Sequence, residues 1–453
     1  MIEESQMTQH TTTIGMRLFT FIWFGQMISL IGSGLTSFAL GIWVYQRTGS
    51  ITDLALIEVF ATIPQIAISP LAGALVDRWN RRFCMIVSNF GAAVSIVAIA
   101  LLFAIHRLEI WHLYLLTAIS YTFYALHMPA YTAATTQLVS SQHLDRASGM
   151  IQLGQSIAQL LSPVLGGLLI VTIQLQGVIL LDVASFLCAI LTLLFVRFPK
   201  IKTTEAKKFG KGSLLSETAY GFSYITKRPG LLGLLLFLAA NNFLVGAFVV
   251  LTTPLVLSFT SPTVLGIILS IGGIGMVVSS LLMSNWKGRQ QHINIVFGFM
   301  LLCGLSILVA GLRPGVPLFT TASFLFFLGL PLIKGSALVI FQKKVPLAIQ
   351  GRVFALNTAL VGASLPLGYA VAGPLADRIF EPLMASNSPL AKSIGLFIGI
   401  GPGRGIGLLF IILGVLTMLT TVVAYQYPRL RRVENELPDA IADKAVALDE
   451  NQG

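Results

Sequence analysis

Charged side chains are scarce in this chain of 453 residues, where Asp, Glu, Lys and Arg together make up only 10%. Hydrophobic residues make up 55%, and the mean hydropathy is +0.84. A soluble domain carries about 25% charged residues, because they keep its surface in water. The shortage of charge therefore argues against a soluble globular protein and indicates a chain whose surface faces lipid.

Cysteine and histidine are also rare, with three and six copies. The cysteines Cys84, Cys188 and Cys303 are odd in number, widely spaced and close to apolar stretches, which argues against a disulfide framework or a metal site. The histidines are scattered, so no nucleophile, base and metal ligands cluster as an enzyme requires. No Walker A stretch is present, so ATP is not the expected driver. We therefore expect no enzyme, no metal and no cofactor.

Long apolar windows fill most of the chain, and each approaches the roughly 20 residues that a helix needs to cross about 30 Å of hydrocarbon. They lie at 17–44, 52–76, 83–105, 111–138, 147–172, 177–197, 231–259, 264–286, 293–312, 316–341, 351–375 and 405–427. The pattern predicts an all-α membrane protein with 12 transmembrane helices.

A polar linker at 198–230 separates the first six windows from the last six. We therefore expect two six-helix bundles, at 17–197 and 231–428, with polar tails at 1–16 and 429–453. A long connection at 376–404, rich in Pro, Ser and Gly, follows the eleventh window and is expected to lie outside the cell.

The net charge of +11 would suggest nucleic-acid binding in a soluble protein, but the positions of the charges exclude it here. Most of the 29 lysines and arginines fall in alternate connections between the windows. The exceptions are Lys334, within a window, and Arg47, Arg107, Arg313, Arg378, Lys392 and Arg404. Because basic connections stay in the cytoplasm, both termini are predicted to be cytoplasmic. We expect a multi-pass protein of the inner (cytoplasmic) membrane, with the bilayer as partner and no nucleic acid.

The turn "GALVDRWNRRF" at 73–83 concentrates charge between two apolar windows, with Asp77 followed by Arg78, Arg81 and Arg82. Composition alone would explain it as a set of positive-inside anchors with one neutralising acid. The same residues, however, resemble the signature G-x-L-x-D-R-x-x-R-R of the major facilitator superfamily.

Three further stretches support this resemblance across the chain. "LSPVLGGLL" at 161–169 is similar to the fifth-helix antiporter motif, with Pro163, Gly166 and Gly167 in place and Ser162 where Gly is usual. The stretches at 48–73 and 342–377 resemble the drug-exporter branch, which includes macrolide-efflux and enterobactin-exporter proteins.

The resemblance implies a gate that closes the cytoplasmic side in one state and opens in the other. The Asp77 carboxylate would face the positive end of a helix dipole, an interaction worth about 0.3 to 1 kcal/mol. The three arginines would pair with the acid between the fourth and fifth helices, and its neighbour would offer Asp77 another partner. The expected gate residues are Gly73, Asp77, Arg78, Arg81, Arg82, Asp145, Arg146, Gly351 and Arg352.

Ionisable residues inside a membrane span are costly, so each is a candidate for function. Glu58 lies in the outer third of the second window and Asp182 near the outer end of the sixth. Either carboxyl could load and release a proton as access to a cavity alternates. We favour Glu58, because sixth helices are peripheral in the fold that the chain resembles. The alternative for Glu58 is an acid that pairs near the outer interface.

The remaining candidates are polar or aromatic residues on windows that line the cavity in the resembled fold. They are Gln26, Tyr124, His127, Asn241, Asn242, Phe327 and Lys334. Lys334 could hold an anionic substrate or a carboxylate, or it could snorkel to the interface. His127 could titrate or be a hydrogen-bonded core residue, and the amides could instead join helices. Sparse polar groups in an apolar chamber suit a lipophilic ligand.

The sequence thus favours a secondary active exporter of hydrophobic or amphipathic small molecules, such as a drug, a macrolide or a siderophore-like compound. Alternating access, proton antiport and a monomeric state are expected. An importer or symporter of a small polar metabolite would need a denser polar cavity than Glu58, Asp182 and Lys334 provide. A lipid transporter and a non-transporting sensor are further alternatives, although a sensor would need a folded soluble domain.

Overall fold

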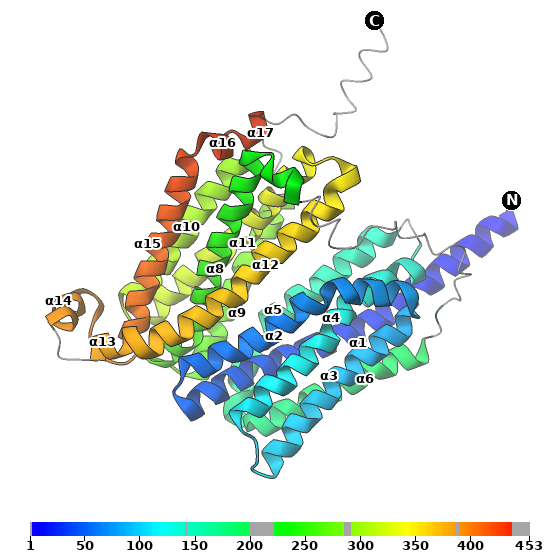
Figure 1. Ribbon diagram of the computed structural model, residues 1–453. Helices are drawn as coiled ribbons and strands as arrows, with labels where there is room; N and C mark the ends of the chain where they lie inside the picture. Colours follow the sequence, from blue (N-terminus) through cyan, green and yellow to red (C-terminus); the bar gives the residue numbers. More distant parts are fainter. Residues whose placement is uncertain are drawn as a thin grey trace, which may run out of the picture. The chain divides into compact units, whose positions relative to one another are not determined.

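The computed structural model describes residues 2–140, 143–196, 198, 222–284, 291–385 and 389–436. Within these ranges the chain forms helices joined by turns and irregular segments, and no strands. Twelve long helices run through these residues, as Figure 1 shows. They are α1 (Ile2–Thr48), α2 (Ile51–Arg78), α3 (Arg81–Ala104), α4 (Ile110–Leu138), α5 (Leu144–Thr172), α6 (Gln174–Phe195), α8 (Pro229–Leu257), α9 (Pro262–Ser284), α10 (His292–Leu312), α11 (Val316–Lys344), α12 (Leu347–Leu375) and α15 (Arg404–Gln426).

Short helical segments follow α12 and α15. A single π-helical turn, η2 (Ala376–Phe380), leads into α13 (Glu381–Ala385) and α14 (Pro389–Ile398). After α15 come α16 (Pro428–Arg431) and α17 (Val433–Glu436). The connection predicted at 376–404 is therefore largely helical where the structure describes it.

Eleven of the described helices are long and apolar enough to cross a membrane, which confirms the all-α membrane fold. The twelfth long helix, α4, has 29 residues but is more polar, because it carries Tyr114, Tyr121, Tyr124 and His127. It packs along both α2 and α3, so we treat it as a span whose polar face is buried in protein. Helix ends agree closely with the predicted windows, except that α1 begins at Ile2.

Close contacts divide the chain into two compact units, which are described separately. Unit 1 comprises Met1–Lys202, Val250–Gly273 and Ala372–Asp377, and unit 2 comprises Thr203–Val249, Ile274–Val371 and Arg378–Gly453. The bundle boundaries at 17–197 and 231–428, and the cytoplasmic location of both termini, stay predictions. Most of the predicted linker at 198–230, and the tail beyond 436, lie outside the described residues.

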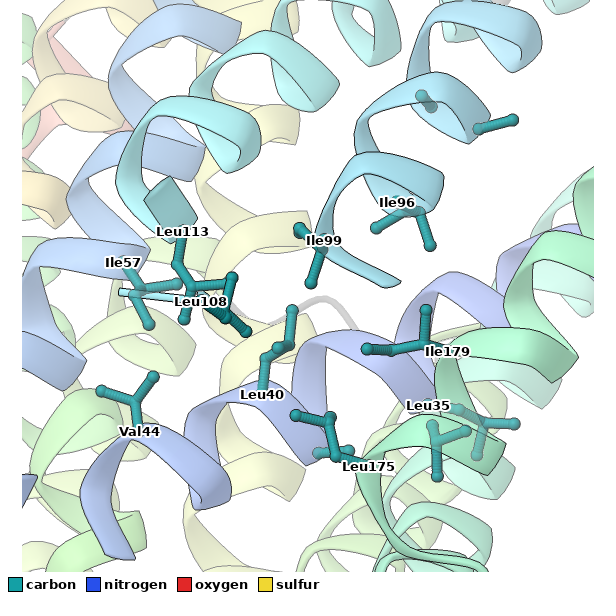
Figure 2. Packing of buried hydrophobic residues seen from close by; sticks show 14 of the residues in the cluster. Leu35, Leu40, Val44, Ile57, Ile96, Ile99, Leu108, Leu113, Leu175 and Ile179 are labelled. Atoms are coloured by element: carbon teal, nitrogen blue, oxygen red, sulfur yellow. The ribbon is translucent and has the colours of Figure 1, made fainter. Parts of the chain in front are cut away.

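Packing in unit 1 centres on a cluster of aliphatic side chains from five helices, shown in Figure 2. Leu40 of α1, Ile99 of α3, Leu113 of α4 and Ile179 of α6 are each at most 5% exposed. In a bilayer the lipid tails are as apolar as these residues, so close packing rather than the hydrophobic effect holds the helices together. Small residues permit that packing: a side chain at Gly32 of α1 would collide with Ser185 of α6.

Unit 2 has an aromatic core and a helix start that is bound by an acid. The ring of Phe248 in α8 lies 4.4 Å from that of Phe326 in α11 and 4.9 Å from that of Phe410 in α15, between centroids. The Glu381 carboxylate accepts hydrogen bonds from the amides of Gly403 (3.1 Å) and Ile406 (2.9 Å) at the start of α15. A carboxylate satisfies the unpaired amides at a helix start and complements the helix dipole.

Candidate functional site

Asp182 on α6 is fully buried in unit 1, with 0% of its surface exposed. Its Oδ1 accepts hydrogen bonds from Ser185 (3.2 Å) and from Ser33 of α1 (3.4 Å). Its Oδ2 has no hydrogen-bond partner among the described residues. The close approach of α1 at Gly32 brings these groups together. Asp182 is therefore enclosed between two helices, although the sequence predicted a peripheral position for it.

Glu58 on α2 is half-buried, and its carboxyl has no hydrogen-bond partner in the described part of the chain. Tyr121 of α4 lies within electrostatic reach of both Glu58 and Asp182. The two acids, which the sequence suggested separately, therefore both lie near the same phenol. Tyr121 was not among the predicted site residues, since its position near both acids depends on how three helices meet.

A cluster of buried polar side chains lies beside Asp182 in unit 1. Asn89 of α3 donates its Nδ2 hydrogen to Oε1 of Gln26 (3.3 Å), while Gln26 Nε2 has no partner among the described residues. Ser88 and the Nδ1 atom of His127 are hydrogen-bonded at 3.3 Å, and the His127 ring stacks on Tyr124 with centroids 5.9 Å apart. The structure thus brings together three predicted cavity residues.

An open cavity of about 520 Å³ lies between α2 and α4, also within unit 1. Its polar lining groups are all uncharged, and Tyr124 borders both this cavity and the buried polar cluster. The lining includes Gln65, Ser69, Tyr124, Met128, Thr132 and Thr136. Its volume falls in the range of about 300 to 1,000 Å³ that small-molecule sites occupy. Of the residues predicted to line a substrate cavity, only Tyr124 belongs to the lining of this one.

The predicted cavity residues of unit 2 have other surroundings. Asn241 donates to the carbonyl of Phe237 (2.9 Å) and accepts from Thr420 of α15 (3.4 Å). Asn242 donates to the carbonyl of Val361 in α12 (2.6 Å). Asn241 and Asn242 thus connect neighbouring helices, which was the alternative to lining the substrate cavity.

Phe327 of α11 is half-buried, and its ring makes an edge contact with Phe326 at 5.3 Å between centroids. The Lys334 side chain, also on α11, is exposed. It forms no hydrogen bond or ion pair with any residue in the described ranges.

Two arginines of the charged turn bind the ends of neighbouring helices in unit 1. Arg81 donates to the carbonyl of Ala133 near the end of α4 (3.0 Å). Arg82 donates to the carbonyls of Leu193 and Leu194 at the end of α6, both at 2.8 Å. The carbonyls of Leu193 and Leu194 are among the last of α6, which are unpaired within the helix and carry its negative pole, so they attract the Arg82 guanidinium group. Ala133 lies more than one turn before the end of α4.

The expected pairing of the arginines with Asp145 stays a prediction for another state of the transport cycle. Asp145 and Arg146 are exposed at the start of α5, and no ion pair joins Asp145 to the turn within the described residues. The side chain of Asp77 lies outside what the structure describes, Gly351 lies in the second turn of α12, and Gly73 borders open space. The contact of Asp77 with the start of α12, near Arg352, stays a prediction.

The small residues of the fifth-helix motif mediate close helix packing. Ser162 donates to the carbonyl of Ile31 in α1 (3.2 Å), and a side chain at Gly166 would collide with Phe38. On the other face of α5, the carbonyl of Gly167 accepts a hydrogen bond from Thr263 of α9 (3.0 Å). Pro163 lies against Gly266 in the same contact. The motif thus places α5 between α1 and the start of α9.

Residues 22–369 match the family model described as Major Facilitator Superfamily, and the chain belongs to that family. Macrolide efflux protein A of Streptococcus pyogenes is 28% identical over 369 residues, which cover 80% of this chain and 90% of that protein. The multidrug efflux pump Tap of Mycolicibacterium fortuitum is 24% identical over 425 residues, covering 91% and 96%.

The fold is also similar to that of solved transporters. A crystal structure of the nucleoside transporter NupG matches with a TM-score of 0.71 and 13% identity, covering 90% of this chain and 100% of that one. At this identity the likeness establishes the fold alone. The resemblance of the charged turn and the fifth-helix motif to the major facilitator superfamily is thus confirmed at the level of the family.

Proposed function

We propose that the chain exports hydrophobic or amphipathic small molecules across the cytoplasmic membrane by alternating access, coupled to proton antiport. The observation that carries this proposal is the open, uncharged cavity between α2 and α4, which Tyr124 connects to buried polar groups. Its mixture of apolar walls and a few neutral hydrogen-bonding groups suits a lipophilic ligand. The names of the macrolide and multidrug efflux relatives support the same substrate class.

Proton coupling is assigned to Glu58 and Asp182, the two acids near Tyr121. Asp182 is fully buried and its Oδ2 has no hydrogen-bond partner within the described residues, while Glu58 is half-buried on α2. An unpaired charge at such a position is costly, which favours uptake of a proton before the site closes. We place Asp182 as the buried proton carrier and Glu58 as the group through which the proton is exchanged.

In this mechanism the two predicted six-helix bundles, 17–197 and 231–428, rock about the substrate with both termini in the cytoplasm. Gating on the cytoplasmic side uses Asp77, as the family resemblance implies, and the transporter acts as a monomer. An importer of polar metabolites is the competing function, and it would require charged or densely polar groups around the ligand. The cavity of unit 1 has neither.

The test is transport by the full chain in proteoliposomes with an imposed pH gradient, using a panel of labelled lipophilic compounds. We expect gradient-driven flux in the wild type and its loss in Asp182→Asn and Glu58→Gln, while downhill flux without a gradient is retained. Asp53→Asn is the matched control, because Asp53 is another acid of α2 and is bound by the Tyr114 hydroxyl at 2.9 Å. Gradient-driven flux that survives both substitutions would exclude the proton assignment.

A further inference from the structure

A single carboxylate binds the first turn of α2 from a distant part of the sequence. Asp377, in the π-helical turn after α12, accepts hydrogen bonds at Oδ1 from the Ile51 amide (3.1 Å) and at Oδ2 from the Thr52 amide (2.8 Å). The hydroxyls of Thr52 (2.6 Å) and Ser50 (3.3 Å) also donate to Oδ2. All of these residues belong to unit 1.

The carboxylate supplies what the first turn of α2 lacks. The first amides of a helix have no partner within it, and the helix start carries the positive pole of the dipole. Ser50 caps the amide of Asp53, so the amides of Ile51 and Thr52 depend on Asp377. The acid in that turn, Asp53, is instead bound by Tyr114. Hydrogen bonds to a charged acceptor are short and strong, so this contact is a firm one.

Backbone packing supports the same contact. A side chain added at Gly373, near the end of α12, would place its Cβ 2.8 Å from the Cα of Thr52 and 3.0 Å from the Cβ of Ala55. Directly after this point the helix takes a π-helical turn, a rare feature that often marks functional positions. The end of α12 is therefore held against the start of α2 by both its backbone and its acid.

We propose that Asp377 is a latch of the transport cycle, which holds the outward-facing start of α2 while that side is closed and releases it when that side opens. In the predicted organisation α2 and α12 belong to different six-helix bundles, which must separate on one side during alternating access. All four hydrogen bonds end on one side chain, so they break together. The proposal rests on the alternating access proposed above but on no particular substrate or coupling ion.

Hydrogen–deuterium exchange of the full chain in lipid nanodiscs tests the latch directly. Asp377→Asn removes the charge and one acceptor, so the amides of residues 50–55 are expected to exchange roughly tenfold faster. If Asp377 is a latch, the released population opens outward and closes inward. Exchange around residues 78–84, at the opposite end of α2, should then become slower. Thr52→Val, which removes one donor and leaves the acid in place, should give the same pattern with smaller amplitude.

Glu381→Gln is the matched control, because Glu381 caps the start of α15 in the way that Asp377 caps α2. It should speed exchange at residues 403–407 and leave both ends of α2 unchanged. Faster exchange at 50–55 alone in Asp377→Asn, no change at all, or a response of α2 to Glu381→Gln would each overturn the latch. These readouts need no substrate, so they remain valid even if the compounds tested in proteoliposomes are not transported.

Discussion

Charged side chains lie at both ends of α2, but they come from different places in the sequence and bind different helices. At its C-terminal end, Arg81 and Arg82 follow within the same turn and bind the carbonyl ends of α4 and α6. At its N-terminal end, the acid Asp377 lies 325 residues from Thr52. The first arrangement is visible as a local motif, whereas the second exists only because two distant segments meet.

The comparison also shows one physical rule in two forms. Cations bind the C-terminal carbonyls of neighbouring helices, and an anion binds the N-terminal amides of α2, in agreement with the helix dipole. The contacts of Arg82 and Asp377 can be released without breaking a helix, because they use only groups that a helix leaves unpaired. Such contacts are therefore suited to a protein that changes conformation.

The largest effect is expected from Arg82→Met, which leaves two helix-end carbonyls without their charged donor. Each lost bond to a charged group is worth about 1.5 to 3 kcal/mol, so the melting temperature in detergent should fall clearly. Arg78→Met is the control, since Arg78 is exposed and forms no hydrogen bond within the described ranges. Equal melting temperatures for the two variants would show that the helix-end contacts contribute nothing to stability.

An intermediate effect is expected from Gly373→Ala, because the new methyl group would lie 2.8 Å from the Thr52 Cα atom. Overpacking of this kind costs about 1 to 3 kcal/mol, so the melting temperature should drop. Gly73→Ala, near the other end of α2, borders open space and should leave stability unchanged or raise it by about 0.5 to 1 kcal/mol. A lower melting temperature for Gly73→Ala than for Gly373→Ala would contradict the described packing at both ends of α2.

The smallest effect is the coupling between Asp377 and Thr52. In a double-mutant cycle with Asp377→Asn and Thr52→Val, the loss in the double variant should be smaller than the sum of the single losses, by about 0.5 to 1.5 kcal/mol. The free energies come from denaturant unfolding in mixed micelles. Strict additivity would mean that the two side chains do not interact, despite the 2.6 Å hydrogen bond between them.

Sequence patterns were sufficient for the helices, because the length of an apolar run is a local property that the thickness of a bilayer sets directly. They also located α4, predicted at 111–138, although its tyrosines and histidine lower its hydropathy. They did not indicate the carbonyl partners of the arginines: an opposite charge at Asp145 attracts attention in a sequence, while unpaired carbonyls at a helix end do not. Any backbone can supply such carbonyls, so no residue type marks them.

The candidate site shows the same division. Gln26, Tyr124 and His127 were predicted one by one, and the structure joins them with Asn89 and Ser88 into one cluster. Glu58 was preferred to Asp182 from position along the chain, but burial depends on how closely neighbouring helices approach. That distance follows from Gly32 and Ser185 meeting across α1 and α6.

The sequence by itself determined that this is a helical membrane protein of the transporter type, which helices it contains and where its basic turn lies. Those properties depend on composition and on spacing over a few dozen residues. Only the tertiary structure decided that Asp182 is enclosed, that Tyr121 lies near two acids and that Asp377 binds α2. Each of these depends on which faces of separate helices come together, and hydrogen bonds between distant residues leave no mark in a local pattern.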